Sequence, residues 1–398
     1  MTSASIARRE EAAGSEPRSR PASIHDVARL AGVSNQTISR VLNGHPSVRV
    51  STRDRVLAAM GELRYRPNRA ARMLGTRRSQ IIGVLAEAGR SRSGQASSVR
   101  AVEEAARERG YYASVVYLGS SAPAAISAAV EDLLAQEVEG VVLVAPQATV
   151  LPRIVPLLAQ IPIVTSLGEL QNAAGTPDCS ADAASGAQTA MRYLIGQGHR
   201  RIVHVAGPPD WHDAQSRLGA YESELWSSGL TALPPVFGDC SADSGYAAGR
   251  ALVRDRARPE GPHRGFTAVF AASDQMALGL MHAFREARLD VPADVSVVGF
   301  GDIPEAAHFW PPLTTVRQDV GELGRSHVAA LIDAIGRVRD PGLAAPATAA
   351  AVRVAGPRLV IRNSVGPASG RPRWGRDDPR GSSLLELAGR QDAVSLHR

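Results

Sequence analysis

The stretch from 23 to 43 carries two short apolar patterns, separated by the sequence Ala-Gly-Val-Ser. In each pattern the apolar residues recur three or four positions apart, which places them on one face of a short helix. Gly32 suits a sharp turn between the helices, and Ser34 is a favourable N-cap for the second. The predicted buried positions are Ile24, Val27, Ala28, Ala31, Ile38, Val41 and Leu42.

The second helix leaves polar side chains facing outward at Asn35, Gln36, Ser39 and Arg40. Two helices joined in this way form a helix-turn-helix, whose second helix enters the major groove of DNA. Asn and Gln side chains make paired hydrogen bonds with adenine, and Arg pairs with guanine or a phosphate. The spacing alone also fits an ordinary helical hairpin with a solvated polar face, and that alternative stays open.

A third helix is predicted to begin at Ser51, where Asp54 completes a pattern similar to a capping box. Its expected buried face consists of Val56, Leu57, Met60 and Leu63. The three helices together would make a small all-α head.

From residue 81 onward, apolar runs rich in β-branched residues alternate with amphipathic helical stretches. Continuous apolar strands separated by helices are typical of parallel sheets covered on both faces. The length of this part favours two doubly wound lobes over one. The predicted strands lie at 81–87, 114–118, 140–145, 162–167, 201–207, 267–273 and 295–300.

Charge is distributed unevenly between the head and the body. Residues 1–80 contain 15 Arg and 6 acidic residues, whereas residues 81–398 contain 30 Arg and 33 acidic residues. A small basic head on a nearly neutral body predicts that the head binds a polyanion such as DNA.

Composition also limits the class of protein. No apolar run reaches the length of a membrane span, and the N-terminus lacks the apolar segment of a secretory signal, so we expect a cytoplasmic protein. Cys179 and Cys240 fit a reducing compartment and give no disulfide framework. No metal-ligand spacing, phosphate-binding loop or nucleophile with a nearby base stands out, so we expect neither a cofactor nor enzymatic activity.

The segments DVARLAGVSNQTISRVLNG and RYRPNRAARMLGTRRSQIIGVL resemble the lactose-repressor (LacI/GalR) family of bacterial transcription regulators, over roughly residues 23–364. The resemblance implies a hinge after the third helix, which becomes helical only when two subunits lie side by side over the minor groove. A leucine of each hinge then wedges into the central base step, and Leu74 matches it. A helix this short does not persist alone, and an apolar wedge allows more contact with bent DNA. The expected DNA contacts are Ser23, His25, Ser34, Asn35, Gln36, Thr37, Ser39, Arg40, Asn43, Arg72 and Leu74.

The resemblance also implies an α/β fold class, with a two-lobed body like that of periplasmic binding proteins, made of doubly wound parallel sheets. The expected parts are disordered tails at 1–22 and 365–398, the helix-turn-helix domain at 23–67, the hinge and linker at 68–80, and an effector-binding and dimerisation domain at 81–364. Within that domain the first lobe is expected at about 81–181 and 320–347, and the second at about 182–319 and 348–364.

Loops at the carboxyl ends of parallel strands form ligand crevices, and here they resemble those of a sugar-responsive branch of the family. In that branch an arginine after a Gly-Pro pair grips ligand hydroxyls, and Arg217 matches it. An ion pair from Arg217 to Asp182 or Asp302 is the alternative. Trp211 fits stacking on a sugar and closing its own loop equally well. The expected effector contacts are Gln147, Asp182, Trp211, Arg217, Cys240, Ser273, Gly301 and Asp302.

Several positions depart from the pattern of that branch. Cys240 stands where the pattern has Trp, Ser273 where it has an amide, Gly301 where it has Asp, and Val320 where it has an aromatic residue. Each change shortens a side chain or removes a hydrogen-bonding group, so a roomier cleft with fewer polar anchors is expected. Three interpretations stay open: a larger sugar such as an oligosaccharide or glycoside, a non-sugar ligand, or a pocket that has lost its ligand. The kept Asp274 and Asp302 also fit a structural role at loop ends.

The sequence therefore predicts a homodimeric, sequence-specific DNA-binding repressor, which a small-molecule inducer, a sugar, releases from a pseudo-palindromic operator. Induction needs only a ligand whose affinity differs between two lobe arrangements. A regulator whose ligand tightens DNA binding, or one that needs no ligand, is the main alternative. A small-molecule binding protein without a DNA role is the alternative from another class, and the basic head argues against it.

The wedge assignment leads to a first prediction. Leu74→Gly is expected to weaken operator binding and to leave ligand binding intact, because glycine cannot hold the base step open and disfavours the hinge helix. Fluorescence anisotropy of labelled operator DNA measures the effect. Equal operator affinity of the variant and the parent would remove the wedge from this account.

Overall fold

The computed structural model describes residues 22–42, 45, 47–65, 78–87, 92–144, 150–165, 183–340 and 356–368, without the side chains of 92–95 and Ala257. The chain forms two units, Met1–Arg78 and Ser79–Arg398, and each is described by itself. The predicted site residues Asn43, Arg72, Leu74, Gln147 and Asp182 lie outside the described residues.

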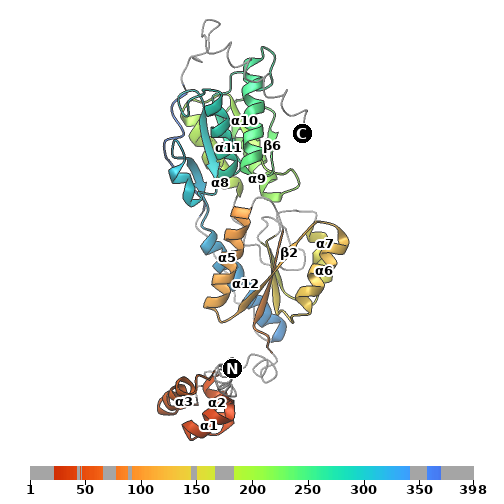
Figure 1. Ribbon diagram of the computed structural model, residues 1–398. Helices are drawn as coiled ribbons and strands as arrows, with labels where there is room; N and C mark the ends of the chain where they lie inside the picture. Colours follow the sequence, from red (N-terminus) through yellow and green to blue (C-terminus); the bar gives the residue numbers. More distant parts are fainter. Residues whose placement is uncertain are drawn as a thin grey trace, which may run out of the picture. The chain divides into compact units, whose positions relative to one another are not determined.

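The described part of the first unit contains three short helices, α1 (Ile24–Ala31), α2 (Asn35–Leu42) and α3 (Val50–Glu62), drawn in red in Figure 1. Ser23 and Asp26 form a capping box at the start of α1, in which each side chain accepts a hydrogen bond from the other's backbone N–H. Gly32 ends α1 with φ +64°, a left-handed conformation that glycine adopts without strain. The predicted helix-turn-helix is confirmed.

The head has a small core in which the predicted apolar stripes meet. Val27, Ile38 and Val56, one from each helix, are fully buried. Such a core fixes the angle between α1 and α2, and with it the direction in which the polar face of α2 points.

Two expectations for the third helix were wrong. The helix begins at Val50 after Arg49, whose side chain makes no capping hydrogen bond, so the predicted pair of Ser51 and Asp54 does not start it. Leu57 is 52% exposed, and Ala59 is buried instead. Leu57 follows Val56 directly and so lies about 100° around the helix from it, away from the stripe that Val56 shares with Ala59.

The second unit contains two separate sheets. The first has the order β2-β1-β3-β4 and is parallel throughout. Its strands are β1 (Ile81–Glu87), β2 (Tyr112–Leu118), β3 (Gly140–Val144) and β4 (Ile163–Thr165). Its helices are α5 (Arg92–Glu108), α6 (Pro123–Leu134), α7 (Leu151–Leu157) and α12 (Val320–Arg339).

Helices cover both faces of this first sheet. Strand residues alternate between the faces, so Val84 packs in the cluster with α5 and α12, and Leu85 packs in the cluster with α6 and α7. The contact between α5 and α12 is close: a β-carbon on Gly324 would lie 2.7 Å from Cβ of Ala101. The predicted continuous apolar strands are therefore explained by burial on two sides.

The second sheet has the order β10-β9-β8-β7-β5-β6, in which β10 alone runs antiparallel to its neighbour. Its strands are β5 (Ile202–Ala206), β6 (Val236–Phe237), β7 (Ala268–Ala271), β8 (Ser296–Phe300), β9 (Thr314–Arg317) and β10 (Arg358–Val360). Its helices are α8 (Ala183–Gly196) and α9 (His212–Ser227) on one face, and α10 (Ala242–Ala257) and α11 (Asp274–Glu286) on the other, with a 3-10 turn at Pro304–His308.

The chain passes between the two sheets more than once. After β9 of the second sheet, α12 returns to pack on α5, β3 and β4 of the first, and β10 then joins the second sheet beside β9. The described crossing between β9 and α12 is short, because only residues 318 and 319 separate them. The other two crossings fall at 166–182 and 341–355, outside the described residues.

One boundary differs from the expectation. Residues 365–368 were expected in a disordered tail, yet they are bound to the second sheet. The Gly366 N–H donates to Ser296 Oγ at 3.1 Å, its carbonyl lies 3.1 Å from His199 Nε2, and Val365 packs on the core. Small and polar residues here are held by backbone hydrogen bonds, which composition does not reveal. Among the described helices, none combines the length and apolar character that a membrane crossing needs.

Tyr221 provides a second prediction. Its hydroxyl is fully buried, lies 3.0 Å from the carbonyls of Ile202 and Leu233, and accepts a hydrogen bond from Leu233 N–H at 3.0 Å. Burial raises its pKa to about 12. Tyr221→Phe leaves these backbone groups without a partner, so we expect a loss of roughly 1–3 kcal/mol in the free energy of unfolding.

Urea unfolding followed by tryptophan fluorescence measures this loss. Tyr117→Phe is the matched control, because Tyr117 is 55% exposed and its loss of a hydroxyl leaves no buried group unpaired. Equal destabilisation by the two variants would contradict the assignment.

Candidate nucleic-acid interface and ligand site

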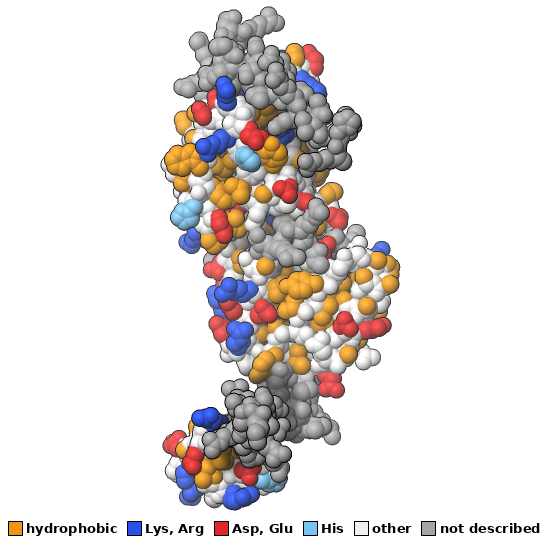
Figure 2. Space-filling view, viewed as in Figure 1, with side chains coloured by type: hydrophobic (Ala, Val, Ile, Leu, Met, Phe, Trp, Pro, Cys, Tyr) orange, Lys and Arg blue, Asp and Glu red, His pale blue; other side chains and the backbone are white. Residues whose placement is uncertain are grey.

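The polar face of α2 is open to solvent as the sequence predicts. Asn35, Gln36, Ser39 and Arg40 are all exposed. The first turn of α2 contains no acidic residue, so the partial positive charge of the helix N-terminus is left to attract an anion. Figure 2 shows arginine side chains over the surface of the head. The face therefore has the hydrogen-bonding groups and the electrostatic character that DNA binding requires.

Three other predicted DNA contacts have local roles in the free protein. Ser23 caps α1, and Ser34 caps α2 by accepting from Thr37 N–H at 3.2 Å. The Ser34 and Thr37 hydroxyls also lie 3.0 Å apart. Their roles at DNA stay predictions.

His25 and Asn35 form the one polar contact that the structure gives between α1 and α2 side chains in the described head. Asn35 Nδ2 lies 2.8 Å from His25 Nδ1, and both side chains are exposed. Both residues are predicted DNA contacts, whereas their contact with each other was not predicted.

The predicted effector residues of the second lobe follow the strands of its sheet. Arg217 lies on α9 and is 6% exposed, and its guanidinium carbon is 4.8 Å from the centroid of the Phe300 ring. Its Nε is buried and has no hydrogen-bond partner among the described residues. The predicted alternative of an ion pair with Asp302 is wrong, because Asp302 is bound by other arginines. A buried, unpaired guanidinium donor is costly unless a ligand completes it.

His204 lies in β5 and is fully buried. Its Nδ1 is 3.0 Å from the Phe270 carbonyl and so carries the proton, which leaves Nε2 as an acceptor without a partner among the described residues. Burial and then the charge of Arg217 lower its pKa to about 4, against a hydrogen bond that raises it. The ring stacks on Phe270 at 4.7 Å. The stacking gives the ring a packing role, and the ring also presents a neutral acceptor within the field of Arg217.

Cys240 and Ser273 meet at the carboxyl edge of the same sheet. The Ser273 hydroxyl donates to the Cys240 carbonyl at 3.1 Å and caps α11 by accepting from Met276 N–H at 3.2 Å. Cys240 is 4% exposed, and burial raises the pKa of its thiol while Arg217 lowers it. Because the Ser273 hydroxyl is used locally, the geometry does not support its predicted contact with the effector, which stays a prediction.

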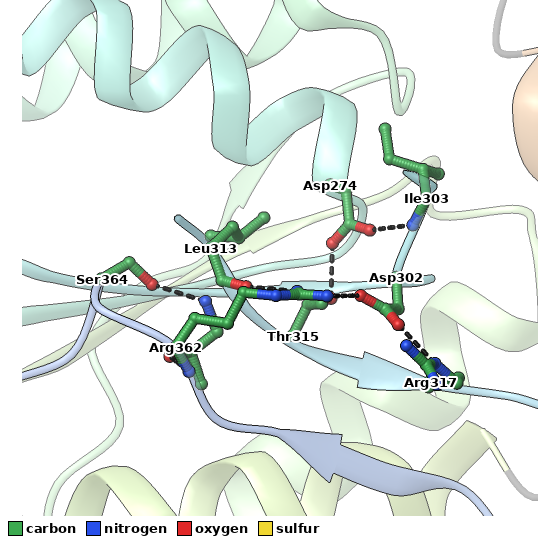
Figure 3. Close-up of polar contacts among 9 residues, drawn as sticks. Asp274, Asp302, Ile303, Leu313, Thr315, Arg317, Arg362 and Ser364 are labelled. Carbon is green, nitrogen blue, oxygen red and sulfur yellow. Dashed lines mark hydrogen bonds and ion pairs between the residues drawn. The ribbon is translucent and has the colours of Figure 1, made fainter. Parts of the chain in front are cut away.

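Asp274 and Asp302 tie several segments together, as Figure 3 shows. Asp274 is fully buried, and its oxygens accept from Ile303 N–H at 2.8 Å and from the Thr315 hydroxyl at 2.5 Å. Asp302 binds the guanidinium groups of Arg317 and Arg362, the latter at 2.7 Å. Their predicted structural role is supported, and the predicted effector contact of Asp302 is not, because both its oxygens are engaged.

The two remaining predicted effector residues within the described part of the chain are Gly301 and Trp211. Gly301 has φ +127°, and its N–H donates to the Val316 carbonyl at 2.8 Å, so its conformation favours glycine whatever the ligand. Trp211 precedes α9 as its N-cap, and its partly buried side chain packs on the core of the second lobe. This packing supports the alternative in which Trp211 closes its own loop.

Two groups that were not predicted also bear on the site, Phe300 and Glu87. Phe300, at the end of a buried strand, provides the ring beneath Arg217. Glu87 ends β1 in the first lobe, and burial followed by the charge of Asp210 in the second lobe raises its pKa. A charged residue at the end of an otherwise apolar strand was the signal that could have indicated Glu87. Across the described residues, no group of three or more His, Cys, Asp or Glu side chains has an arrangement that would hold a metal ion.

Comparisons with known proteins cover both units. A model for "Bacterial regulatory proteins, lacI family" matches residues 23–68, and one for a "Periplasmic binding protein-like domain" matches residues 191–365. The lactose operon repressor of Escherichia coli (strain K12) is 35% identical over 325 residues, which is 79% of this chain and 84% of that protein.

The solved structures that are similar to this one include two complexes. A structure of the Lac repressor dimer bound to operator and the anti-inducer ONPF matches with a TM-score of 0.72 at 31% identity, covering 87% of this chain and 100% of that chain. A complex of the transcriptional regulator CelR with cellobiose matches with a TM-score of 0.60 at 32% identity, covering 86% of this chain and 99% of that chain.

Asp274 provides a third prediction. Burial raises its pKa from 3.8 to about 6, against hydrogen bonds from Thr315 and Ile303 that lower it. Between these two values the folded chain binds more protons here than the unfolded chain, so this contribution to stability falls as pH rises. An asparagine amide at this position can accept from Ile303 and donate to Thr315 without any charge.

We therefore expect Asp274→Asn to gain stability relative to the parent between pH 4 and 7, by roughly 3 kcal/mol across the window. Urea unfolding of both proteins at several pH values measures the difference. His204, whose pKa is lowered, changes stability with pH in the opposite direction, but it does so in both proteins and therefore cancels in the comparison. Asp333→Asn, at an exposed position, is the control. Parallel stability curves for Asp274→Asn and the parent would contradict the raised pKa.

Proposed function

This chain belongs to the lacI family of bacterial regulatory proteins and is a DNA-binding regulator of transcription, and from that premise we propose a homodimeric repressor that a sugar releases from its operator. The relatives described above are regulators rather than enzymes, and no catalytic step is part of the proposal. Three features of the chain support its three parts, namely the head, the exposed apolar surface and the buried arginine.

The exposed polar face of α2 supports operator binding. Its amides and guanidinium match the donors and acceptors of the major groove, and the capped N-terminus of the helix favours the phosphates beside it. One small head buries too little surface for tight, specific binding, so two heads on a two-fold axis are expected to bind two half-sites. A pseudo-palindromic operator follows from that symmetry.

Exposed apolar side chains on the second lobe support a homodimer. Leu278 on α11 is 44% exposed, and Trp310, just before β9, is 82% exposed. Aromatic side chains such as that of Trp310 are enriched where two chains meet. The similar Lac repressor structure is a dimer, which makes a second copy of this chain the partner we propose.

Arg217 is the observation that carries the effector proposal. Its forked donors are held over the Phe300 ring, and its Nε lacks a partner among the described residues. A guanidinium of this kind holds two neighbouring hydroxyls at once. Sugars present such hydroxyl pairs, and the CelR relative is solved with cellobiose.

The size of the proposed sugar follows from the lack of other anchors. Ser273 and Asp302 spend their hydrogen-bonding groups inside the protein, and Cys240 is smaller than the tryptophan of the family pattern. A site with few polar anchors gains affinity from apolar contact area. An oligosaccharide or a glycoside, which offers more area than a monosaccharide, is therefore the class we propose.

Release of DNA would depend on the short crossing from β9 to α12. Arg317, the last residue of β9, binds Asp302, and Asp319 caps α12 by accepting from Glu322 N–H at 2.9 Å. A ligand that shifts the second sheet thus acts on α12, which packs on α5 of the first lobe. The ligand need only prefer one lobe arrangement over the other.

Fluorescence anisotropy tests the proposal, with DNA from the upstream region of the protein's own gene and a panel of mono-, di- and trisaccharides. One saccharide should release the DNA from the parent protein. Arg217→Met is expected to bind the DNA equally well and to need at least tenfold more of that saccharide, since it loses charge-assisted hydrogen bonds but keeps an apolar stem. Arg153→Met, which removes an exposed arginine elsewhere in the body, is the control.

The outcomes separate the parts of the proposal. Absence of any sequence-specific DNA binding would contradict the repressor itself. A saccharide that tightens binding would replace induction with corepression. Tight DNA binding that no saccharide alters, or equal response of Arg217→Met and the parent, would contradict the sugar site.

A further inference from the structure

We propose that His25 and Asn35 act as one base-reading unit, in which His25 fixes the orientation of the Asn35 amide and thereby sets the base that the head accepts. The inference rests on the proposed DNA-binding function and adds a residue that determines its specificity. It makes His25 a positioning residue for Asn35, whatever contact with DNA it also makes.

The two side chains meet across the helix-turn-helix. Asn35 is the first residue of α2 and His25 the second of α1, and the distance from Nδ2 to Nδ1 is 2.8 Å. Both backbones are well fixed at this point, because Ser23 and Asp26 cap one helix and Ser34 caps the other. The contact therefore joins two rigid supports, so it is not a chance meeting of two mobile side chains.

The amide orientation of Asn35 is coupled to the tautomer of the His25 ring. Asn35 Nδ2 faces His25 Nδ1 and an amide nitrogen is a donor, so in this arrangement Nδ1 accepts and the ring proton lies on Nε2. In this tautomer the reversed amide would place its oxygen against the lone pair of Nδ1, so reversal also requires the ring proton to move to Nδ1. His25 thus favours the amide orientation present in the structure, and the Asn35 oxygen and second N–H stay free for another partner.

The order of these free groups decides which base fits. Adenine presents an acceptor, N7, beside a donor, the N6 amino group, and one amide orientation matches both. The reversed amide puts an N–H where the oxygen was, and there it can donate to O6 of guanine or O4 of thymine. The amide torsion is broad and roughly two-fold in a free asparagine, so both orientations are open without a neighbour. In its Nε2–H tautomer His25 disfavours the second orientation and so biases Asn35 toward adenine.

Gln36 offers an internal comparison. It is the next residue on α2, is equally exposed, and carries the same amide, yet the structure gives its side chain no hydrogen bond to a described residue. Its amide is free to turn. The base that Gln36 meets should therefore be read less strictly than the base that Asn35 meets.

The experiment selects bound DNA from a library with randomised half-sites and then measures affinities for the selected operator and its single-base variants. The proteins are full-length parent, His25→Phe, His25→Asn, Asn35→Ala, Gln36→Ala and the double variants. His25→Phe keeps a ring without an acceptor, and His25→Asn places an amide oxygen near the position of Nδ1. Circular dichroism checks that each variant folds, which the exposure of these side chains favours.

The parent should prefer adenine at one position of each half-site, by roughly five- to 150-fold over the other bases, the range of a paired amide contact. His25→Phe should lower that preference by about tenfold at this position and leave the other positions unchanged. His25→Asn should keep only part of it, because the introduced amide can itself turn and present either its oxygen or its nitrogen to Asn35. In the Asn35→Ala background His25→Phe should change nothing further at that position, while its effect should be unaltered by Gln36→Ala.

Each contrary outcome has a separate meaning. If the parent selects no sequence, the proposed function fails and this inference fails with it. If the parent selects an operator but His25→Phe keeps the same base preference, or weakens binding equally to all sequences, the reading unit alone is overturned. Additive effects of the His25 and Asn35 changes would overturn it as well.

Discussion

Two buried carboxylates hold the carboxyl edge of the second sheet together, and the rest of the body depends on them. Asp274 joins the start of α11 to Ile303 and to Thr315 of β9, and Asp302 joins β9 to the chain that returns at Arg362. Arg362 also donates to the Leu313 carbonyl at 2.7 Å. Charges are costly to bury, and they persist here because every carboxylate oxygen has a partner. The segment that leaves for the first lobe and the segment that returns from it are thus fixed at one place.

This arrangement also limits the groups available to a ligand. The polar side chains that hold the edge together do not also bind a sugar without being released first, which would expose buried backbone groups. Asp302 and Ser273 are used in this way, and Gly301 has no side chain. Arg217 remains, supported by the Phe300 ring and close enough to His204 for its charge to depress the histidine pKa. One strong anchor with apolar surroundings is the kind of site that follows from such a scaffold.

How much of this was predictable depends on whether a feature is local or tertiary. The seven apolar strands and the two helices of the helix-turn-helix could be predicted, because periodicity and burial are imprinted along the sequence itself. β6, β9 and β10 were missed, since they are two to four residues long and owe their strand conformation to a neighbouring strand. The role of Asp302 could not be predicted in full, because Arg362 lies 60 residues away along the chain.

The candidate sites show the same limit. The polar face of α2 was predicted residue by residue, but its contact with His25 joins two helices and leaves no local pattern. Phe300 was an ordinary apolar strand residue until Arg217 was placed above its ring. Leu74, Gln147 and Asp182 stay predictions, because they lie outside the described residues.

The magnitudes decide whether so sparse a ligand site is able to control DNA binding. Reversing a two-state equilibrium from 99:1 to 1:99 needs a ligand preference of about 10⁴, or roughly 5.5 kcal/mol. A hydrogen bond to a charged group contributes roughly 1.5–3 kcal/mol, so one anchor in each subunit of a dimer supplies roughly 3–6 kcal/mol. Contacts to phosphates at an exposed head weaken with salt, whereas a buried guanidinium is screened far less. A single arginine per subunit is therefore sufficient in principle, provided that it binds ligand in only one of the two lobe arrangements and that both subunits change together.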